Sequence, residues 1–581
     1  MKNEACDKKH RLTENFLEYN LELTATAAAT GYFTCRPATV LEIRDIISRL
    51  RCTPFDEFLH TLLLNHICAL PENEFEIFFR QALDDHDSLL MAVGYEAGLL
   101  GKMPSSLKKR ISKIDPTALM PHTPLIVIKH KTAIDHNLHR KWISLFRENL
   151  LNHQPLPRPE ENPLPLVFDP KNLKTRYAHQ TDISAIHEKH HAGKAASPSF
   201  GLDRTIRKAL KILENINILE GEEMRHESSL SPYALLRGWR MSVSVQNGRN
   251  HFRLSGIQTS YGRGLSLDAA RASNLMEILE RYASFAVFEE TRIRGYQAEY
   301  EMVHGSFSSM GDKGPAALDP NHLCLEAAYH DEKLYWMEAR TPDEGKSESI
   351  WVPAQIVFPF CNLDEPCLFS GLGTTGLASG NTLAQAKVSA LLEIFERDAE
   401  ATMPYDLSRC FRVESREGDT APLLEAYRSA GIDLVFQDLT SSFGIPCCKC
   451  LVRGLDGSIS KGGGAHLSAK KALVSAMTET PYPFPHGPES ARLPDGLVMV
   501  PLERLPDYST GDPDLDLAIL EDILAQNHIS PIYVDLTRKD TGIPVVRAIV
   551  PGLEIMADFD EFSRVSPRLF HNYLNLFGKI S

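Results

Sequence analysis

Two segments of the chain read almost alike: SNLMEILERYAS at residues 273–284 and SALLEIFERDAE at residues 389–400. Each places Glu-x-x-Glu-Arg among apolar residues that cover most of a helix circumference. Apolar residues at spacings of three and four predict a helix, and their abundance predicts that the helix is largely buried. The two segments therefore predict a pair of buried helices that carry the same acidic motif.

Within each motif the two glutamates lie three positions apart, so they share one face of the helix. Buried carboxylates on one face repel each other unless an arginine or a metal cation neutralises them. One interpretation is an ion pair within each helix, between a glutamate and the arginine four positions later. The other is a bound cation, which the presence of a second copy favours. The glutamates are Glu277, Glu280, Glu393 and Glu396, and the arginines are Arg281 and Arg397.

A longer repeat becomes visible when the chain is aligned on Glu277, Glu393 and Glu479. Each glutamate follows a hydroxyl residue by eleven positions, an alanine by seven and a serine by four. These offsets fall on one helical face, so three helices are expected to share a stripe of small residues. The hydroxyl residue is typical of a helix N-cap, and Gln385 completes a capping box in the second helix. The three hydroxyl residues are Ser266, Thr382 and Ser468.

Further segments suggest repeated strands and close turns. DLTSSFGIPCCKCLV and DLTRKDTGIPVVRAIVPG both read as strand, turn and strand, which predicts duplicated units of one sheet. The glycine-rich SYGRGLS and SGLGTTGLASGNT precede the two acidic helices. Glycine lets backbone N–H groups approach phosphate, although such a segment is often only a turn. No GxxxxGK[ST] loop is present, so a nucleotide site here would be of another kind.

The sequence pattern of the 581-residue chain changes at a proline-rich stretch, HQPLPRPEENPLPLVFDP. Segments before it, such as FDEFLHTLLLNHICAL, have helical periodicity, whereas strand-like runs such as LYWMEAR alternate with helices after it. Dense proline continues neither a helix nor a central strand. We therefore expect a mainly α-helical domain at residues 1–152, a linker at 153–190, and an α/β (mixed α+β) domain of repeated strand–helix units at 191–581.

The composition excludes several classes of protein. A formal net charge of −14 argues against nucleic acid as a partner, and no apolar run is long enough to cross a bilayer. The first residues lack the apolar region of a signal peptide. The eleven cysteines show no zinc-ribbon spacing, and the group Cys447, Cys448 and Cys450 is interpreted as core thiols or, alternatively, as a metal or redox site. A cytoplasmic location is expected.

Two other segments are weaker candidates for a functional site. HEKHH at residues 187–191 matches the His-Glu-x-x-His pattern of zinc proteases, but its polar surroundings favour a solvated helix end over a protease or an adventitious metal site. Glu479 lacks the second glutamate and the arginine of the motif, and Pro481 ends its helix. A structural role is therefore expected for Glu479.

The acidic motifs themselves predict a Mg²⁺–nucleotide site. Mg²⁺ prefers carboxylate oxygens and keeps coordination positions open for water and for substrate phosphates. Metal ions held by four glutamates would neutralise a triphosphate.

These segments resemble the YcaO family of ATP-dependent enzymes that modify peptide backbones. The resemblance is carried by ARASNLMEILER, GLASGNTLAQAKVSALLEIFERDA, GAHLSAKKALVSAMTE and IPVVRAIVPGLE, and it leaves the N-terminal helical region outside. It implies a YcaO-type catalytic domain with ATP in a cleft, where glutamates hold Mg²⁺ against the phosphates. It also implies that a nucleophile adds to a backbone amide, that ATP phosphorylates the resulting oxygen, and that an azoline, amidine or thioamide forms.

The resemblance assigns individual residues. The implied metal ligands are Glu277, Glu280, Glu393 and Glu396, and these residues together with Arg397 are the implied catalytic set. Where the family commonly has a further acidic ligand this chain has Gln385, whose amide oxygen brings no charge. The implied nucleotide contacts are Lys194, Thr205, Ser273, Arg281, Asn381, Gln385 and Arg397.

Two functions from different classes remain open. The first is an ATP- and Mg²⁺-dependent enzyme. The sequence ends in LNLFGKIS and lacks the proline-rich tail of azoline-forming members, which favours thioamide over azoline formation. The second is a non-catalytic nucleotide-binding accessory factor for a sulfur-modifying enzyme, such as one acting on a ribosomal protein. Expected partners are a peptide or protein substrate, a second copy in a homodimer, and a TfuA-like, E1-like or sulfur-transfer protein, with neither nucleic acid nor membrane.

Overall fold

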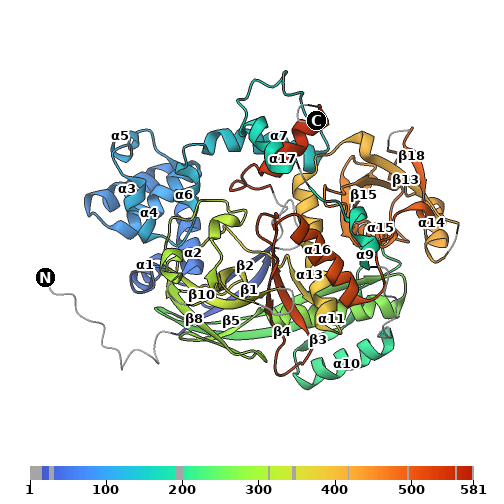
Figure 1. The fold of residues 1–581 in the computed structure, drawn as a ribbon. Helices are drawn as coiled ribbons and strands as arrows, with labels where there is room; N and C mark the ends of the chain where they lie inside the picture. The colour runs from blue at the N-terminus through green and yellow to red at the C-terminus, as the bar shows by residue number, and fades with distance from the viewer. Residues whose placement is uncertain are drawn as a thin grey trace.

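The computed structural model describes residues 16–24, 32–178, 180–190, 201–311, 314–342, 348–416, 418–493, 496–555 and 559–578. Figure 1 shows blue helices at one side, a broad sheet in the lower part, and a second group of orange strands at the opposite side. None of the described helices is long and apolar enough to cross a membrane. The arrangement confirms a mixed α/β region rich in sheet that is preceded by a helical region.

The larger sheet has fourteen strands among the described residues, and its main path runs β12-β20-β19-β10-β8-β7-β6-β4-β5-β1-β2. Its longest pair is the antiparallel hairpin of β4 and β5. The strands are β1 (Leu17–Thr24), β2 (Tyr32–Pro37), β3 (Leu219–Arg225), β4 (Tyr233–Asn247), β5 (Asn250–Gly264), β6 (Val287–Glu289), β7 (Arg292–Arg294), β8 (Tyr300–Gly305), β9 (Ala316–Ala317), β10 (Leu334–Thr341), β11 (Glu348–Pro353), β12 (Leu377–Ser379), β19 (Ile532–Asp535) and β20 (Val545–Ile549).

The smaller sheet has six strands in the described part of the chain, with the main order β16-β15-β14-β13-β18. β16 is the last strand on one side and pairs only with β15. The strands are β13 (Cys410–Glu414), β14 (Val435–Asp438), β15 (Cys447–Gly454), β16 (Ile459–Ala465), β17 (Ser490–Ala491) and β18 (Val498–Pro501). Cys447, Cys448 and Cys450 are buried on β15, as core thiols would be.

The predicted Gly-Ile-Pro repeat forms two antiparallel hairpins, β14 with β15 and β19 with β20. The strand–turn–strand reading is confirmed, and Gly444 and Gly542 both have positive φ before the second strand. The expectation that both units belong to one sheet is wrong, because each hairpin lies in a different sheet. Local sequence determines a hairpin turn, whereas sheet membership depends on contacts between distant segments.

The N-terminal region is helical, but it also contributes to the large sheet. β1 pairs with β5 in parallel and with β2 antiparallel, and the hydrophobic core of the sheet continues into α2, α3 and α4. The domain boundaries at 152 and 191 stay a prediction. The helices of this region are α1 (Ile43–Cys52), α2 (Glu57–Ala69), α3 (Glu72–Asp84), α4 (Ser88–Ala97), α5 (Lys108–Ile111), α6 (Val127–Thr132) and α7 (His136–Asn152).

The proline-rich stretch packs onto the molecule. Its carbonyl groups at Pro165 and Pro157 accept hydrogen bonds from Trp142 Nε1 at 2.8 Å and from Tyr573 Oη at 2.9 Å. These two aromatic residues belong to a separate hydrophobic cluster between α7 and the last helix, α17 (Pro567–Leu576). Figure 1 shows α7 and α17 side by side.

The remaining helices surround the two sheets. α11 follows β5, α13 follows β12 and α15 follows β16, so each predicted repeat is a strand followed by a helix. They are α8 (Pro170–Tyr177), α9 (His187–His190), α10 (Leu202–Asn215), α11 (Leu267–Ser284), α12 (Phe307–Met310), α13 (Leu383–Thr402), α14 (Thr420–Ser429), α15 (Ala469–Glu479) and α16 (Pro513–Gln526).

The helix caps largely match the repeat. Ser266 Oγ accepts from Ala269 N at 3.2 Å, and Thr382 Oγ1 accepts from Gln385 N at 3.1 Å, so both residues are N-caps. Ser468 occupies the N-cap position of α15, but its side chain makes no capping hydrogen bond. The backbone N of Ser468 donates instead to His466 Nδ1 at 2.8 Å, and this hydrogen bond fixes the start of α15.

Glycines let α11 and α15 lie close to the strands that precede them. A Cβ placed on Gly262 would lie 2.1 Å from the carbonyl oxygen of Ala270, and one on Gly464 would lie 2.2 Å from that of Ala472. The segment SYGRG was expected to be a glycine-rich loop, but it forms the end of β5. Its glycines therefore permit close helix–strand packing.

Candidate nucleotide and metal site

The first acidic pair lies on α11, on the side of the helix that faces β5 and β12. Tyr261 N donates to Glu277 Oε2 at 3.0 Å, and Ser379 N donates to Glu280 Oε2 at 3.2 Å. Arg281 Nε lies 3.6 Å from Glu277 Oε1 and 3.7 Å from Glu280 Oε1. These separations are those of a loose ion pair rather than of a hydrogen bond. The predicted pair of Glu277 and Arg281 is therefore present without saturating either carboxylate.

The second acidic pair lies on α13. Arg397 Nη1 donates to Glu400 Oε2 at 2.9 Å and lies 3.8 Å from Glu396 Oε1. Among the described residues it makes no salt bridge to Glu393, so the alternative interpretation of an ion pair between these two residues is not supported. The reason is that Glu400, one turn beyond Glu396, provides a better-placed carboxylate for the guanidinium.

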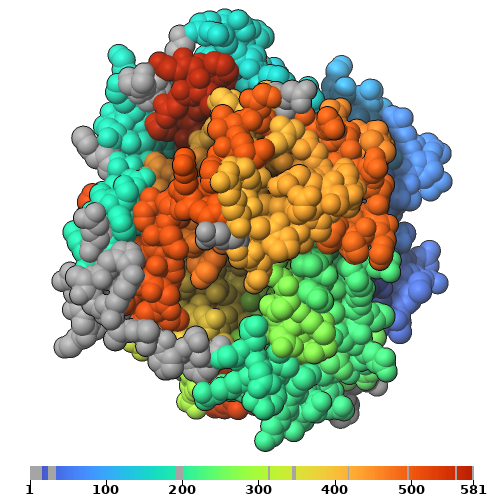
Figure 2. Space-filling view, turned by 90° about the vertical axis from the view of Figure 1, so that its right-hand side faces the viewer, coloured from blue at the N-terminus to red at the C-terminus, as the bar shows by residue number. Residues whose placement is uncertain are grey.

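The two pairs lie near each other, and we call the group of Glu277, Glu280, Glu393 and Glu396 the acidic recess. The side chains of Glu280, Glu396 and Glu277 keep 17, 19 and 27% of their surface accessible. They are thus neither core residues nor freely solvated. The face seen in Figure 2 is hollowed between green and orange segments, with yellow atoms at its floor.

The two pairs are near enough for the charge of one to affect the pKa of the other. Burial raises the pKa of Glu280 to about 8, and the negative charges of Glu393 and Glu277 add to the effect. Burial also raises the pKa of Glu396 to about 8, with Glu400 and Glu393 acting in the same direction. The pKa values of Glu277 and Glu393 are raised too, mainly by burial. Burial therefore outweighs the nearby arginines in setting the pKa values of these glutamates.

A third guanidinium, Arg547 on β20, lies next to the recess. Its side chain is 2% exposed, and Nε and Nη2 donate at 3.2 Å to the carbonyl oxygens of Ile356 and Gly373. Its Nη1 is buried and has no hydrogen-bond partner in the described part of the chain. Burial lowers the pKa of Arg547 to about 10, while the charge of Glu393 opposes this shift. A buried cation with an unused N–H group is suited to binding an anion.

Three of the predicted nucleotide contacts meet at the N-terminus of α13. Thr205 Oγ1 on α10 donates to Asn381 Oδ1 at 3.1 Å, and Asn381 N donates to Gln385 Oε1 at 2.9 Å. Gln385 thus has a structural role in this loop, although it receives the hydrogen bond from Asn381 and not from the N-cap residue. The helix N-terminus and these polar groups form one edge suited to an anionic ligand.

The other predicted positions are more scattered. Ser273 is exposed on α11, one turn before Glu277, and Lys194 lies outside the described residues. His187 lies on the four-residue α9, where its Nδ1 is 3.0 Å from the carbonyl oxygen of Ser184, and His191 lies outside the described residues. In the described part of this segment, no group of three or more metal-binding side chains is arranged to hold a metal ion.

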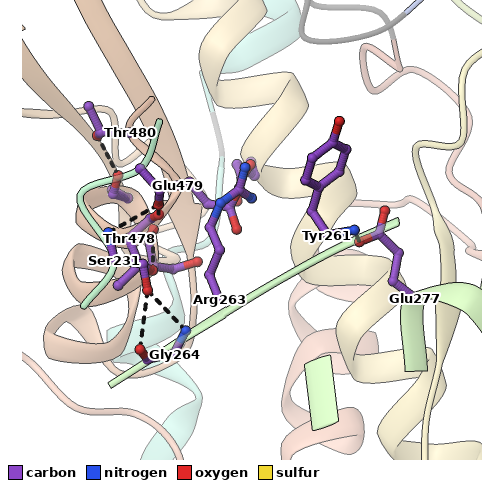
Figure 3. A network of polar contacts seen from close by, with 12 residues as sticks. Ser231, Tyr261, Arg263, Gly264, Glu277, Thr478, Glu479 and Thr480 are labelled. Carbon is purple, nitrogen blue, oxygen red and sulfur yellow. Dashed lines mark hydrogen bonds and ion pairs between the residues drawn. The ribbon is translucent and has the colours of Figure 1, made fainter. Parts of the chain in front are cut away.

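The third repeat brings Glu479 to the border of the recess. Figure 3 shows Arg263, near the end of β5, reaching toward Glu479 at the end of α15, with Tyr261 further along the same strand and next to Glu277 of α11. Arg263 Nη1 and Glu479 Oε2 form a short ion pair. The charge of Glu479 also raises the pKa values of Glu277 and Glu396. The structural role expected for Glu479 is consistent with this pairing.

Sequence reasoning missed three residues at this site. Arg547 lies within the segment IPVVRAIVPGLE, where a charge inside an apolar strand was the available signal. Glu400 continues the acidic face of α13 by one turn. Gly463 on β16 lies against the acids: a Cβ built on it would be 2.9 Å from Glu400 Oε1 and 3.2 Å from Glu396 Oε1.

The residues of the recess fit Mg²⁺ and a nucleotide. Among the described residues no group of three or more His, Cys, Asp or Glu side chains is arranged to hold a metal ion, so the glutamates of the recess form no ready-made cluster of that size. Mg²⁺ is commonly held by one or two carboxylates, with phosphate oxygens and water in its other positions. Under-neutralised carboxylates beside the orphaned Arg547 match this combination of a cation and an anion.

Comparisons with known proteins agree with this chemistry. Residues 261–554 match the family described as the ATP- and Mg²⁺-binding YcaO cyclodehydratase. An uncharacterized protein of Methanothermobacter thermautotrophicus is 28% identical over 333 residues, which cover 51% of this chain and 82% of that protein. A protein of Rhizobium leguminosarum bv. trifolii, described as lying in the tfuA 3′ region, is 27% identical over 238 residues, or 38% of this chain and 53% of that one.

Solved structures show more distant similarity. A heterocyclase in complex with substrate and cofactor is 19% identical with a TM-score of 0.47, and the match covers 64% of this chain but only 56% of that one. The YcaO protein of Methanopyrus kandleri, bound with AMPPCP and Mg²⁺, is 22% identical with a TM-score of 0.43, over 61% of this chain and 91% of that one.

Proposed function

The chain belongs to the YcaO family, whose cofactors are ATP and Mg²⁺, and we propose that it activates a backbone amide of a peptide or protein by phosphorylating its oxygen. The single observation that carries this proposal is the acidic recess. Two partly exposed carboxylate pairs lie near each other on separate helices, and burial raises their pKa values, which a bound cation would lower again.

The chain's own residues divide into three roles in this proposal. The four glutamates of the recess hold Mg²⁺, which accounts for their incomplete pairing with Arg281 and Arg397. The three arginines meet the phosphates, and Arg547 contributes its unused Nη1. The polar edge at α10 and α13 binds the remainder of the nucleotide through Thr205, Asn381 and Gln385, together with Ser273 and Lys194 of the predicted set.

Catalysis then rests on position and charge. Mg²⁺-bound ATP would supply the phosphoryl group that turns the amide oxygen into a leaving group. The glutamates and arginines hold the reacting groups in line and neutralise charge as it develops, so little covalent chemistry is required of the protein. The recess is partly shielded from water, which strengthens each of these electrostatic contacts.

The nature of the nucleophile decides the product. A sulfur nucleophile gives a thioamide, and an adjacent side chain gives an azoline. We favour a thioamide, with a TfuA-like, E1-like or sulfur-transfer protein as partner; the name of the Rhizobium relative is consistent with the first of these. A homodimer stays a prediction that sedimentation would test. The alternative function is a nucleotide-binding accessory factor, because the recess would bind Mg²⁺-ATP equally well without turnover.

The proposal is tested by the Glu393→Gln variant, which removes one charge from the recess and keeps the side-chain shape. We expect Mg²⁺-ATP affinity to fall by about tenfold or more, because a metal ligand loses its charge. Calorimetric titration with Mg²⁺-ATP measures this. The matched control is Glu425→Gln on the exposed surface of α14, which should bind as the unmodified protein does. Unchanged affinity in Glu393→Gln would refute the assignment of metal ligands.

Turnover separates the enzyme from the accessory factor. Phosphate release from ATP that rises when peptides are added would support the enzyme, and a matching mass change in the peptide would identify the product. Nucleotide binding without phosphate release, with or without the candidate partners, would favour the accessory factor.

A further inference from the structure

β16 has an open edge beside the acidic recess. It is the last strand of the smaller sheet and pairs on one side with β15, from Ile459 opposite Arg453 to Ala465 opposite Cys447. Apart from this pairing, no backbone hydrogen bond reaches Gly462, Gly463 or Gly464 from the described residues. An unpaired strand edge presents a row of N–H and C=O groups that can add another extended backbone.

Helices cover both faces of β16, so only the edge of this strand is open. Gly462 and Gly464 lie against α15, since a Cβ on either would approach its backbone to 2.5 or 2.2 Å. Gly463 faces the opposite way, toward Glu396 and Glu400 on α13. The edge therefore runs between two helices and passes directly beside the proposed Mg²⁺ ligands.

In the first repeat, the residue equivalent to Gly463 is Tyr261, and its backbone N–H has a hydrogen-bond partner. Tyr261 lies sixteen residues before Glu277, and its backbone N–H donates to that glutamate at 3.0 Å. Gly463 lies sixteen residues before Glu479 and takes the same place relative to α15. Glu479 instead pairs with Arg263, and beyond the pairing with Lys449 no hydrogen bond reaches Gly463 from the described residues. The third repeat has thus left this edge position uncovered.

We propose that the substrate peptide binds as an added β-strand along the open edge of β16, which places one of its backbone amides beside Glu396. This inference rests on the proposed function and specifies how its substrate is held. Backbone pairing is independent of side-chain identity, so it suits an enzyme whose target is the backbone itself. The run Gly462–Gly464 also allows another chain to approach closely.

Hydrogen exchange tests the proposal without knowledge of the natural substrate. The probe is a pool of unstructured, random-sequence ten-residue peptides, added with Mg²⁺ and a non-hydrolysable ATP analogue to the full chain. We expect the amides of residues 459–465 to exchange at least about tenfold more slowly, because added strand pairing protects an edge. β2, the edge strand at the far end of the large sheet, serves as the internal control and should not change.

Two matched controls examine the backbone contact itself. A peptide pool with every second amide N-methylated cannot form the ladder and should give no protection of β16. In the protein, Ile459→Pro removes an N–H on the same side of the strand as that of Gly463, because these groups alternate along a strand. Peptide protection should be lost in this variant and retained in Ile459→Ala, while both bind the nucleotide analogue normally.

The outcomes separate the two proposals. If the analogue binds but the pool leaves β16 unprotected, or protects β2 equally, strand addition is wrong and the proposed nucleotide site stands. If a pool with N-methylated amides protects β16 as well as the unmodified pool, the contact is not a backbone ladder and strand addition is again wrong. Failure of the analogue itself to bind would refute the proposed function and this inference with it.

Discussion

At the scale of single residues, Glu277 and Glu479 occupy equivalent places in two copies of one unit but have different surroundings. Glu277 accepts a hydrogen bond from Tyr261 and lies near Arg281, whereas Glu479 pairs with Arg263 and is 44% exposed. Spacing along the chain predicted that a glutamate ends each stripe of small residues. It could not predict the partner, because Arg263 is 216 positions away from Glu479 in sequence.

Local spacing in the sequence predicted the four glutamates of the recess. It could not predict Arg547, which reaches the site through contacts between distant segments. A helical face can be read from residues three and four apart, and Glu393 with Glu396 form such a set. Arg547 enters the site only because β20 pairs with β12, which precedes α13. Gly463 and Glu400 likewise acquire their relation through the packing of β16 on α13.

A buried carboxylate outside the recess provides a pH test. Burial raises the pKa of Glu365 to about 8, against the hydrogen bonds that it accepts from Tyr335 N and from Gln355 Nε2 at 2.8 Å. The folded protein therefore holds this proton more tightly than the unfolded chain. Stability from this group is complete below about pH 4.5 and is lost as the pH rises toward about 8.

The Glu365→Gln variant cannot ionise at this position, so it should not show that loss. Denaturant unfolding at pH 5 and pH 8 measures the effect. The unfolding free energy of the unmodified protein should fall by about 2–4 kcal/mol more than that of the variant between these values. Parallel pH curves for the two proteins would contradict the burial argument.

At the scale of elements, the strand–helix repeat depends on glycine as much as on glutamate. Gly262 and Gly464 take the same place against α11 and α15, since a Cβ built on either would lie 2.1 or 2.2 Å from the facing carbonyl oxygen. The small residues of each helix were predicted as a shared stripe, and Ala270, Ala386 and Ala472 are indeed fully buried. Gly262 was interpreted as part of a glycine-rich loop, because a strand end and such a loop have similar compositions.

Gly262→Ala tests this close packing. The added methyl group has no space between β5 and α11, so we expect the free energy of unfolding to fall by about 1–3 kcal/mol. Gly311→Ala is the control, because nothing lies within 4 Å of its Cβ position and its φ is negative. The control should change stability by less than about 0.5 kcal/mol. Equal effects in denaturant unfolding would show that helix–strand approach is not the cause.

At the scale of the whole molecule, α13 joins the recess to the C-terminal helix α17. Asp398, the residue after Arg397, is buried and accepts a hydrogen bond from Glu554 N at 2.9 Å and a short one from Arg568 Nη1 on α17. The packing of α17 and of the proline-rich stretch on α7 was not predictable from sequence. It joins residues near 142, 165 and 573 that no local pattern relates.

Removing one member of this pair tests the connection. Asp398→Ala leaves Arg568 buried without its counter-charge, which should lower the free energy of unfolding by about 3–5 kcal/mol. Asp203→Ala breaks an exposed i,i+4 pair with Arg207 and should cost no more than about 0.5 kcal/mol. Thermal or denaturant unfolding compares them. Similar small losses in both variants would mean that α17 does not depend on the buried pair.

The pairing of Glu479 with Arg263 has a consequence for how freely the copies can vary. Exchanging both partners together, for example to two apolar residues, should leave activity largely intact, because neither has to meet a metal ion. The corresponding positions on α11 and α13 should accept almost no replacement. A saturation library scored for function would thus find one permissive copy of the repeat and two restrictive copies.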